Sequence, residues 1–78
     1  MPVVRLFAQA REAAGTSSEV LAGDTVGAVL DGARGRFGDE FAAVLSTCTV
    51  WVNGEPADES VAVVGDDEVA ILPPVSGG

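Results

Sequence analysis

The sequence predicts an α+β fold in which a mixed β-sheet is covered on one face by one main helix. Segments of alternating apolar residues stand near both ends of the chain, whereas one segment between them repeats apolar residues every three or four positions. Apolar residues make up 47% of the 78 residues, enough for the core of one small domain without disulfides. We therefore expect a single domain over residues 1–78.

The start of the chain is predicted to form a hairpin. Residues 3–8 are rich in β-branched and aromatic side chains, which favours a strand with Val4, Leu6 and Ala8 facing the core. Residues 9–14 are expected to form a short helical turn that Gly15 ends. Residues 17–22 can then return as a second strand.

The main helix is expected next, because five apolar residues recur with helical spacing. They are Val26, Val29, Leu30, Ala33 and Phe37. Thr25 and its neighbours supply N-cap oxygens, and Gly38 suits the C-cap. Three glycines inside the helix cost about 1 kcal/mol each in helical propensity, so packing onto the sheet must hold it.

The second half of the chain is predicted to be mostly strands. A short helical turn over residues 40–45 is followed by a strand over 49–53, which the Asn53-Gly54 turn ends. Residues 55–64 contain Pro56 and are assigned to an edge strand. The last strand covers residues 68–72, after an acidic turn.

Strand parity predicts an apolar patch on the sheet face that the main helix leaves bare. Phe7, Trp51 and Leu72 point outward there, and they lie together if the first, third and last strands are neighbours. Such patches mark partner sites. The alternatives are three isolated surface hydrophobes, or partial cover by residues 9–14.

The charge and residue types narrow the classes of function. Twelve acidic residues against four arginines give a net charge of −8, which disfavours nucleic acid and anionic membranes as partners. The chain has no histidine and a single cysteine, Cys48, so no Cys/His metal site is expected and Cys48 is taken as a small core residue. With no signal peptide or membrane-spanning run, a cytoplasmic protein is expected.

The C-terminal residues 73–78 are predicted to be a flexible, extended tail. Pro73 and Pro74 stiffen its start, and Val75, Ser76 and Gly77 lead to a terminal Gly78 without a side chain. Six residues could reach roughly 20 Å from the domain. We expect the tail to thread a narrow channel in a partner and to present the Gly78 carboxylate as the reacting group. The alternative is an inert, frayed terminus.

Three segments of the sequence are similar to those of a known protein family. They are Leu6-Phe7-Ala8 with Ala10-Arg11-Glu12, Val52-Asn53-Gly54-Glu55, and the stretch from Gly65-Asp66-Asp67-Glu68-Val69 to Leu72-Pro73-Pro74-Val75-Ser76-Gly77-Gly78. Together they resemble the MoaD family of ubiquitin-like sulfur carriers, the small subunits of molybdopterin synthase. The resemblance implies the β-grasp fold, with the first and last strands parallel at the centre of the sheet.

The resemblance also implies a function. An E1-like (MoeB-like) enzyme uses ATP to adenylate Gly78, sulfur then makes a thiocarboxylate there, and the large (MoaE-like) subunit directs that sulfur to cyclic pyranopterin monophosphate. The chain would bind no cofactor itself and would be a carrier, not an enzyme. Arg11, from the matching segment, joins Phe7, Trp51 and Leu72 as an expected partner-binding residue.

Other functions remain open from the sequence. A carrier of the same fold could serve thiazole or cysteine synthesis, since such relatives also end in Gly-Gly. A ubiquitin-like modifier would instead join its activated tail to lysines of other proteins. A plain interaction module with an inert tail is the remaining alternative.

Overall fold

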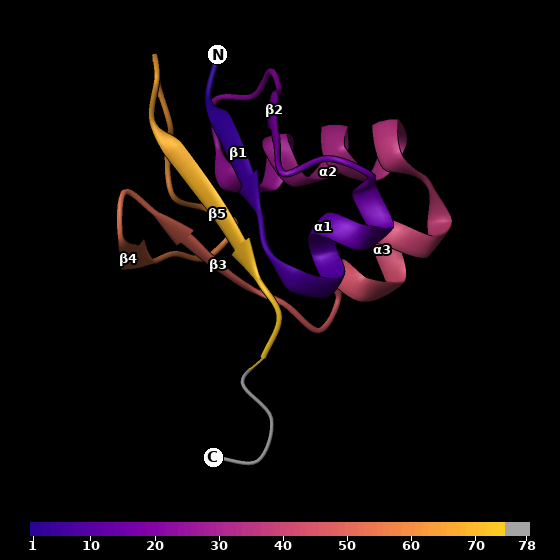
Figure 1. Ribbon diagram of the computed structural model, residues 1–78. Coiled ribbons are helices and arrows are strands. Elements are labelled where there is room, and N and C mark those ends of the chain that lie inside the picture. The colour runs from indigo at the N-terminus through magenta and orange to yellow at the C-terminus, as the bar shows by residue number, and fades with distance from the viewer. Residues whose placement is uncertain (75–78) are drawn as a thin grey trace.

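A computed structural model describes residues 1–74, which form a mixed sheet packed against helices (Figure 1). The strands of this sheet are β1 (Val3–Leu6), β2 (Ser18–Val20), β3 (Thr49–Val52), β4 (Glu55–Pro56) and β5 (Glu68–Leu72). Their order is β2-β1-β5-β3-β4, and β1 runs parallel to β5 while the other neighbours are antiparallel. The predicted central parallel pair is confirmed.

The helices lie together on one side of the sheet (Figure 1). They are α1 (Ala8–Ala14), α2 (Val26–Phe37) and α3 (Asp39–Leu45). The main helix was predicted correctly as α2, but α1 and α3 are complete short helices that pack on each other and complete the layer. The inner face of the sheet and the helices enclose one buried cluster, in which Val4, Ile71 and Phe41 are fully inaccessible to solvent.

Both ends of α2 are capped as predicted. The Thr25 hydroxyl oxygen accepts a hydrogen bond from the Ala28 N–H at 3.1 Å, and the Gly38 N–H donates to the Arg34 carbonyl at 3.0 Å. The N–H groups of Val26 and Gly27, the first two residues of α2, have no acceptor within the helix, and they donate to the carbonyls of residues 61 and 59 at 2.9 Å. The loop before β5 is thereby fixed to the start of α2.

The first predicted strand is too long at its C-terminal end. β1 ends at Leu6, and Ala8 is the first residue of α1 instead of a core-facing strand residue. The reason is local: Ala8 has a positive φ of 51°, which turns the chain sharply out of the strand direction. The second strand is likewise shorter than residues 17–22.

The predicted edge strand over residues 55–64 is wrong over most of its length. Only Glu55–Pro56 pairs with β3, after a tight turn in which Asn53 and Gly54 both have positive φ. Ala62 forms an isolated bridge with Thr25 instead, and Val63 is buried in the core. The segment does not follow the sheet edge, because its carbonyls accept hydrogen bonds from the first N–H groups of α2 and hold it at the N-terminus of that helix.

Candidate functional site

The bare face of the sheet carries the predicted outward residues. In the register, Val4 pairs with Val69 and Leu6 pairs with Ile71, and all four side chains are buried. The alternate positions therefore face away from the helices, and Trp51 pairs with Ala70 there. We call the group formed by Phe7, Trp51, Ala70 and Leu72 the open-face patch.

Phe7 is held at the junction between the sheet and α1. Its N–H donates to the Ile71 carbonyl at 3.3 Å, which continues the β1–β5 ladder, and its own carbonyl accepts from Ala10 N at 3.1 Å, which begins the helix. Its backbone is extended, with φ −125° and ψ 147°. Although both its N–H and its carbonyl are held by hydrogen bonds, the large apolar side chain of Phe7 is 44% exposed. Exposed apolar side chains that gather in a patch are typical of partner sites.

The chain leaves the sheet next to Phe7. β5 ends at Leu72, which is half-buried, and Pro73 and Pro74 follow outside the strand. The expected tail residues Val75, Ser76, Gly77 and Gly78 lie outside the described residues. The structure thus brings the start of the tail, Leu72 and Phe7 to one edge of the open-face patch.

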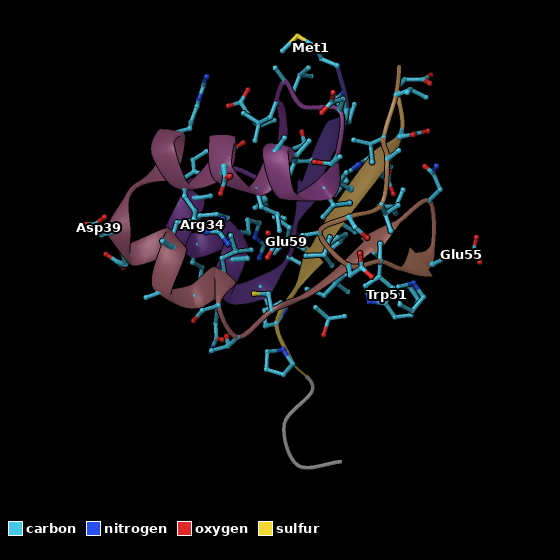
Figure 2. All side chains as sticks on the ribbon, turned by 180° about the vertical axis from the view of Figure 1, so that it is seen from behind. Met1, Arg34, Asp39, Trp51, Glu55 and Glu59 are labelled. Carbon is cyan, nitrogen blue, oxygen red and sulfur yellow. The ribbon has the colours of Figure 1, made fainter. Side chains whose placement is uncertain are left out.

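Trp51 lies at the other side of the patch. Figure 2 shows its ring projecting from β3 on the side away from Arg34 and Asp39, which belong to the helical layer. It is half-buried, with Ala70 on one neighbouring strand and Pro56 on the other at the same level. The β5 positions of Ala70 and Leu72 connect Trp51 to Phe7 across the sheet.

Arg11 differs from the other three arginines. Arg5, Arg34 and Arg36 lie 3.2, 2.7 and 3.0 Å from the carboxylates of Glu68, Asp31 and Glu19. Among residues 1–74, no carboxylate lies within ion-pair distance of Arg11, which is exposed on α1. This cation, one turn beyond Phe7 in α1, is available to an acidic group of a partner.

Cys48 belongs to the helical side of the sheet. Its thiol donates to the Val44 carbonyl at 3.2 Å and packs against the core. Burial raises the pKa of the Cys48 thiol, only partly offset by the neighbouring Thr47. A protonated thiol is a poor nucleophile, so Cys48 behaves as the small core residue that was expected.

Two neighbours of the patch were missed from the sequence. Pro56 faces Trp51 across the β3–β4 pair, and the Arg5–Glu68 ion pair borders the patch on β1 and β5. A signal for Pro56 existed, because a two-residue turn at Asn53-Gly54 places residue 56 opposite residue 51. Predicting the Arg5–Glu68 ion pair would have required the register of the parallel β1–β5 pair, which no local sequence pattern gives.

The model of the ThiS family matches residues 4–78, nearly the whole chain. The chain belongs to the ThiS family. Its fold is the ubiquitin-like β-grasp, and members of this family are small sulfur carriers and modifiers that are generally not catalytic themselves.

Three solved structures illustrate the range of its relatives. SAMP1 from Haloferax volcanii is 34% identical, with a TM-score of 0.76 over 99% of this chain and 98% of that one. A chain of the BexX/CysO complex from Amycolatopsis orientalis is 25% identical, with a TM-score of 0.83 over 100% of both chains. A provisionally assigned molybdopterin converting factor, subunit 1, from Pyrococcus furiosus is 22% identical, with a TM-score of 0.80 over 95% and 97%, which supports the fold alone.

These ThiS-family neighbours also bear on partners. The Amycolatopsis structure is a complex of CysO with BexX, so one of these neighbours is seen together with a partner protein. In this chain, no helix within residues 1–74 has the length and apolar character needed to cross a bilayer. The expected roles of Gly78, of the tail and of the four partner-binding residues stay predictions.

Proposed function

We propose that this ThiS-family protein is a sulfur carrier whose Gly78 carboxylate is activated by an ATP-using, E1-like enzyme and converted to a thiocarboxylate. The observation that supports this most directly is the exit of the chain from the sheet. β5 is a central strand, and it ends at Leu72 beside Phe7, whose side chain is 44% exposed on the open-face patch. A partner that docks on the patch is then within reach of the tail.

The chemistry explains why a carboxylate terminus needs such a partner. A carboxylate is a poor electrophile, but its attack on the α-phosphate of ATP releases pyrophosphate and leaves an acyl adenylate with a good leaving group. A sulfide-level donor then displaces AMP, and the thiocarboxylate sulfur is a strong nucleophile. The chain has no histidine to supply a base, and the Cys48 thiol lies on the helical side of the sheet. The catalytic groups therefore belong to the partner.

We place the carrier in molybdenum cofactor synthesis, in the cytoplasm, with a MoaE-like large subunit and a MoeB-like activating enzyme as partners. The support is the resemblance of Leu6-Phe7-Ala8, Ala10-Arg11-Glu12 and the Pro73-to-Gly78 ending to the MoaD family. The large subunit would direct the thiocarboxylate sulfur to cyclic pyranopterin monophosphate and build the dithiolene of molybdopterin. The carrier itself binds no cofactor in this proposal; ATP is the substrate of the activating enzyme.

A second function is favoured by one comparison. This chain is 34% identical to SAMP1 from Haloferax volcanii and 29% identical to SAMP1 from Methanosarcina acetivorans. SAMP1 is described as a small archaeal modifier protein. The same activated Gly78 could acylate lysines of other proteins. Since this chain contains no lysine, it could not be modified on its own side-chain amines.

The acceptor separates the two functions. The thiocarboxylated carrier is offered to the cognate large subunit with cyclic pyranopterin monophosphate, and in parallel the adenylated carrier is offered to a lysine-rich protein extract. The proposal predicts that the pterin gains sulfur while the carrier returns to its carboxylate form. Lysine conjugates with no pterin product would establish the modifier instead, and sulfur transfer to a cysteine or thiazole precursor would assign a different biosynthetic branch. A chain lacking Gly78 is the control and should be inert in every arm.

A further inference from the structure

Asn53 is the one asparagine of the chain, and it is followed by Gly54. The two residues form the exposed turn between β3 and β4, where both have positive φ, 49° and 85°. A Cβ at Gly54 would meet nothing within 4 Å, so the turn is open to water on that side. Glycine after asparagine also lets its backbone nitrogen approach the side-chain amide carbon closely, because no Cβ hinders it.

The chemistry that this arrangement permits is deamidation. The nitrogen of Gly54 forms a bond to Cγ of Asn53, the Cγ–Nδ2 bond breaks, and Nδ2 leaves as ammonia with the proton of the Gly54 N–H. Water then opens the resulting cyclic imide at either carbonyl, which yields aspartate or isoaspartate at position 53. The reaction consumes only water, so it needs no enzyme and no redox partner.

In the folded protein, both polar atoms of the Asn53 side chain have partners at the start of β5. Nδ2 donates to a carboxylate oxygen of Asp67 at 3.1 Å, and Oδ1 accepts from the Glu68 N–H at 2.9 Å. The Asn53 N–H also donates to the Glu68 carbonyl at 2.9 Å. Attack by Gly54 makes Cγ tetrahedral and expels Nδ2, so it must displace both side-chain atoms from these partners. The hydrogen bonds therefore oppose the reaction.

The product does not fit the same partners. Asp67 is ionised at neutral pH, since the Val64 N–H and the Asn53 amide hold its pKa below the ordinary value. Deamidation replaces the donor Nδ2 by a carboxylate oxygen, so a hydrogen bond becomes a contact between like charges. Isoaspartate also lengthens the backbone by one carbon in a two-residue turn, which disturbs the register of the hairpin.

We propose that Asn53 is a latent modification site, which deamidates when the β3–β4 turn opens away from Asp67 and which then prevents the turn from closing as before. The bond to Asp67 suppresses the reaction in the folded protein, and the product cannot form that bond again. Each opening of the turn thus risks an irreversible change. Because β3 also carries Trp51, the change reaches the open-face patch.

The rate of deamidation tests this inference. The unsubstituted protein and Asp67→Ala are incubated at neutral pH, and mass spectrometry follows the deamidated fraction of the peptide that contains Asn53. We expect the folded, unsubstituted protein to react much more slowly than the same chain unfolded in denaturant. Folded Asp67→Ala should react faster than the unsubstituted protein by roughly tenfold or more, because the lost bond ends on a charged group. The purified deamidated protein should unfold at a lower temperature than the unmodified one.

Leu45→Ala is the control for general destabilisation, because Leu45 is a core residue of α3, outside the β3–β4 hairpin. The two variants are compared at denaturant concentrations that give them the same free energy of unfolding, and Asp67→Ala should still react faster. Equal rates for the two variants overturn the inference, as does a folded, unsubstituted protein that reacts as fast as the unfolded chain. An unchanged unfolding temperature of the deamidated protein also contradicts it.

Discussion

The N–H of Phe7 donates to the carbonyl of Ile71 at 3.3 Å, although β1 ends one residue earlier. The bond extends the parallel register by one step, from the Leu6–Ile71 pair to neighbouring positions for Phe7 and Leu72. Phe7 is therefore fixed on the bare face at the point where the last strand ends. An exposed aromatic ring in this position suits a docking contact better than a core contact.

Phe7→Ser combined with Leu72→Asp should separate docking from folding. Burying two such side chains in a complex contributes about 1.5 to 3 kcal/mol each, so the double variant should bind the large subunit weaker by two or more orders of magnitude. Its unfolding temperature should fall only slightly, because Phe7 is already 44% exposed in the free protein. Titration calorimetry and thermal unfolding measure the two effects.

The matched control is Val20→Ser, which alters a residue that is 49% exposed on β2. It should leave the affinity for the large subunit unchanged. If the double variant unfolds while its folded fraction binds normally, Phe7 and Leu72 belong to the core and the docking assignment is wrong.

Two glycines of α2 should respond differently to alanine. A Cβ at Gly35 meets nothing within 4 Å, so Gly35→Ala should stabilise the protein by about 0.4 to 1 kcal/mol through the entropy of the unfolded chain. A Cβ at Gly27 would lie 3.2 Å from the Glu59 carbonyl oxygen, which already accepts the Gly27 N–H. Gly27→Ala should therefore gain none of this stability. Chemical denaturation of both variants compares them, and an equal gain at Gly27 would show that the loop yields easily.

Asp67 should make stability depend on pH in acid. Its carboxylate accepts hydrogen bonds from the Val64 N–H at 2.9 Å and from the Asn53 amide at 3.1 Å, and these hold the pKa of Asp67 below its ordinary value of 3.8. The contribution to stability is thus complete above that ordinary pKa and is lost as the pH falls through the lower pKa of the folded state. Asp67→Ala should lower the unfolding temperature at neutral pH, and the difference from the unsubstituted protein should shrink in acid.

Asp66→Ala is the neighbouring control. None of the side-chain hydrogen bonds found within residues 1–74 involves Asp66, so this variant should unfold close to the unsubstituted protein at neutral pH. A temperature difference for Asp67→Ala that stays constant down to strong acid would contradict the role given to its carboxylate.

Gly77→Val should impair transfer much more than folding. A β-branched side chain would clash in the narrow channel that the tail is expected to thread, whereas residue 77 lies beyond the last strand. The unfolding midpoint should stay the same, and the rate at which the cognate enzyme adenylates the tail should drop. Normal turnover by the valine variant would show that the channel accommodates side chains.

The sequence predicted the elements whose residues alternate or repeat regularly. Val69 and Ile71 alternate with outward residues along β5, and the helical stripe of α2 is buried at Val26 and Val29. The central parallel pair came from the resemblance, because pairing between residues far apart in the chain leaves no local pattern.

The errors arose where tertiary contacts decide the backbone. Ala8 leaves the strand through a positive φ that alanine seldom adopts, and its apolar side chain gave no warning of this. Val61 and Val63 alternate as a strand would, yet their segment satisfies the N-terminus of α2 instead of a sheet edge. The outward positions of Phe7, Trp51 and Leu72 followed from parity alone, whereas Pro56 depended on the hairpin register.

The most direct test of the carrier function is the intact mass of the protein after incubation with its adenylating enzyme, ATP and a sulfur donor. The account predicts that one oxygen is replaced by sulfur, that the change maps to Gly78, and that a chain lacking Gly78 folds normally but is not modified. An unmodified mass in the presence of an enzyme that demonstrably adenylates another carrier would contradict it.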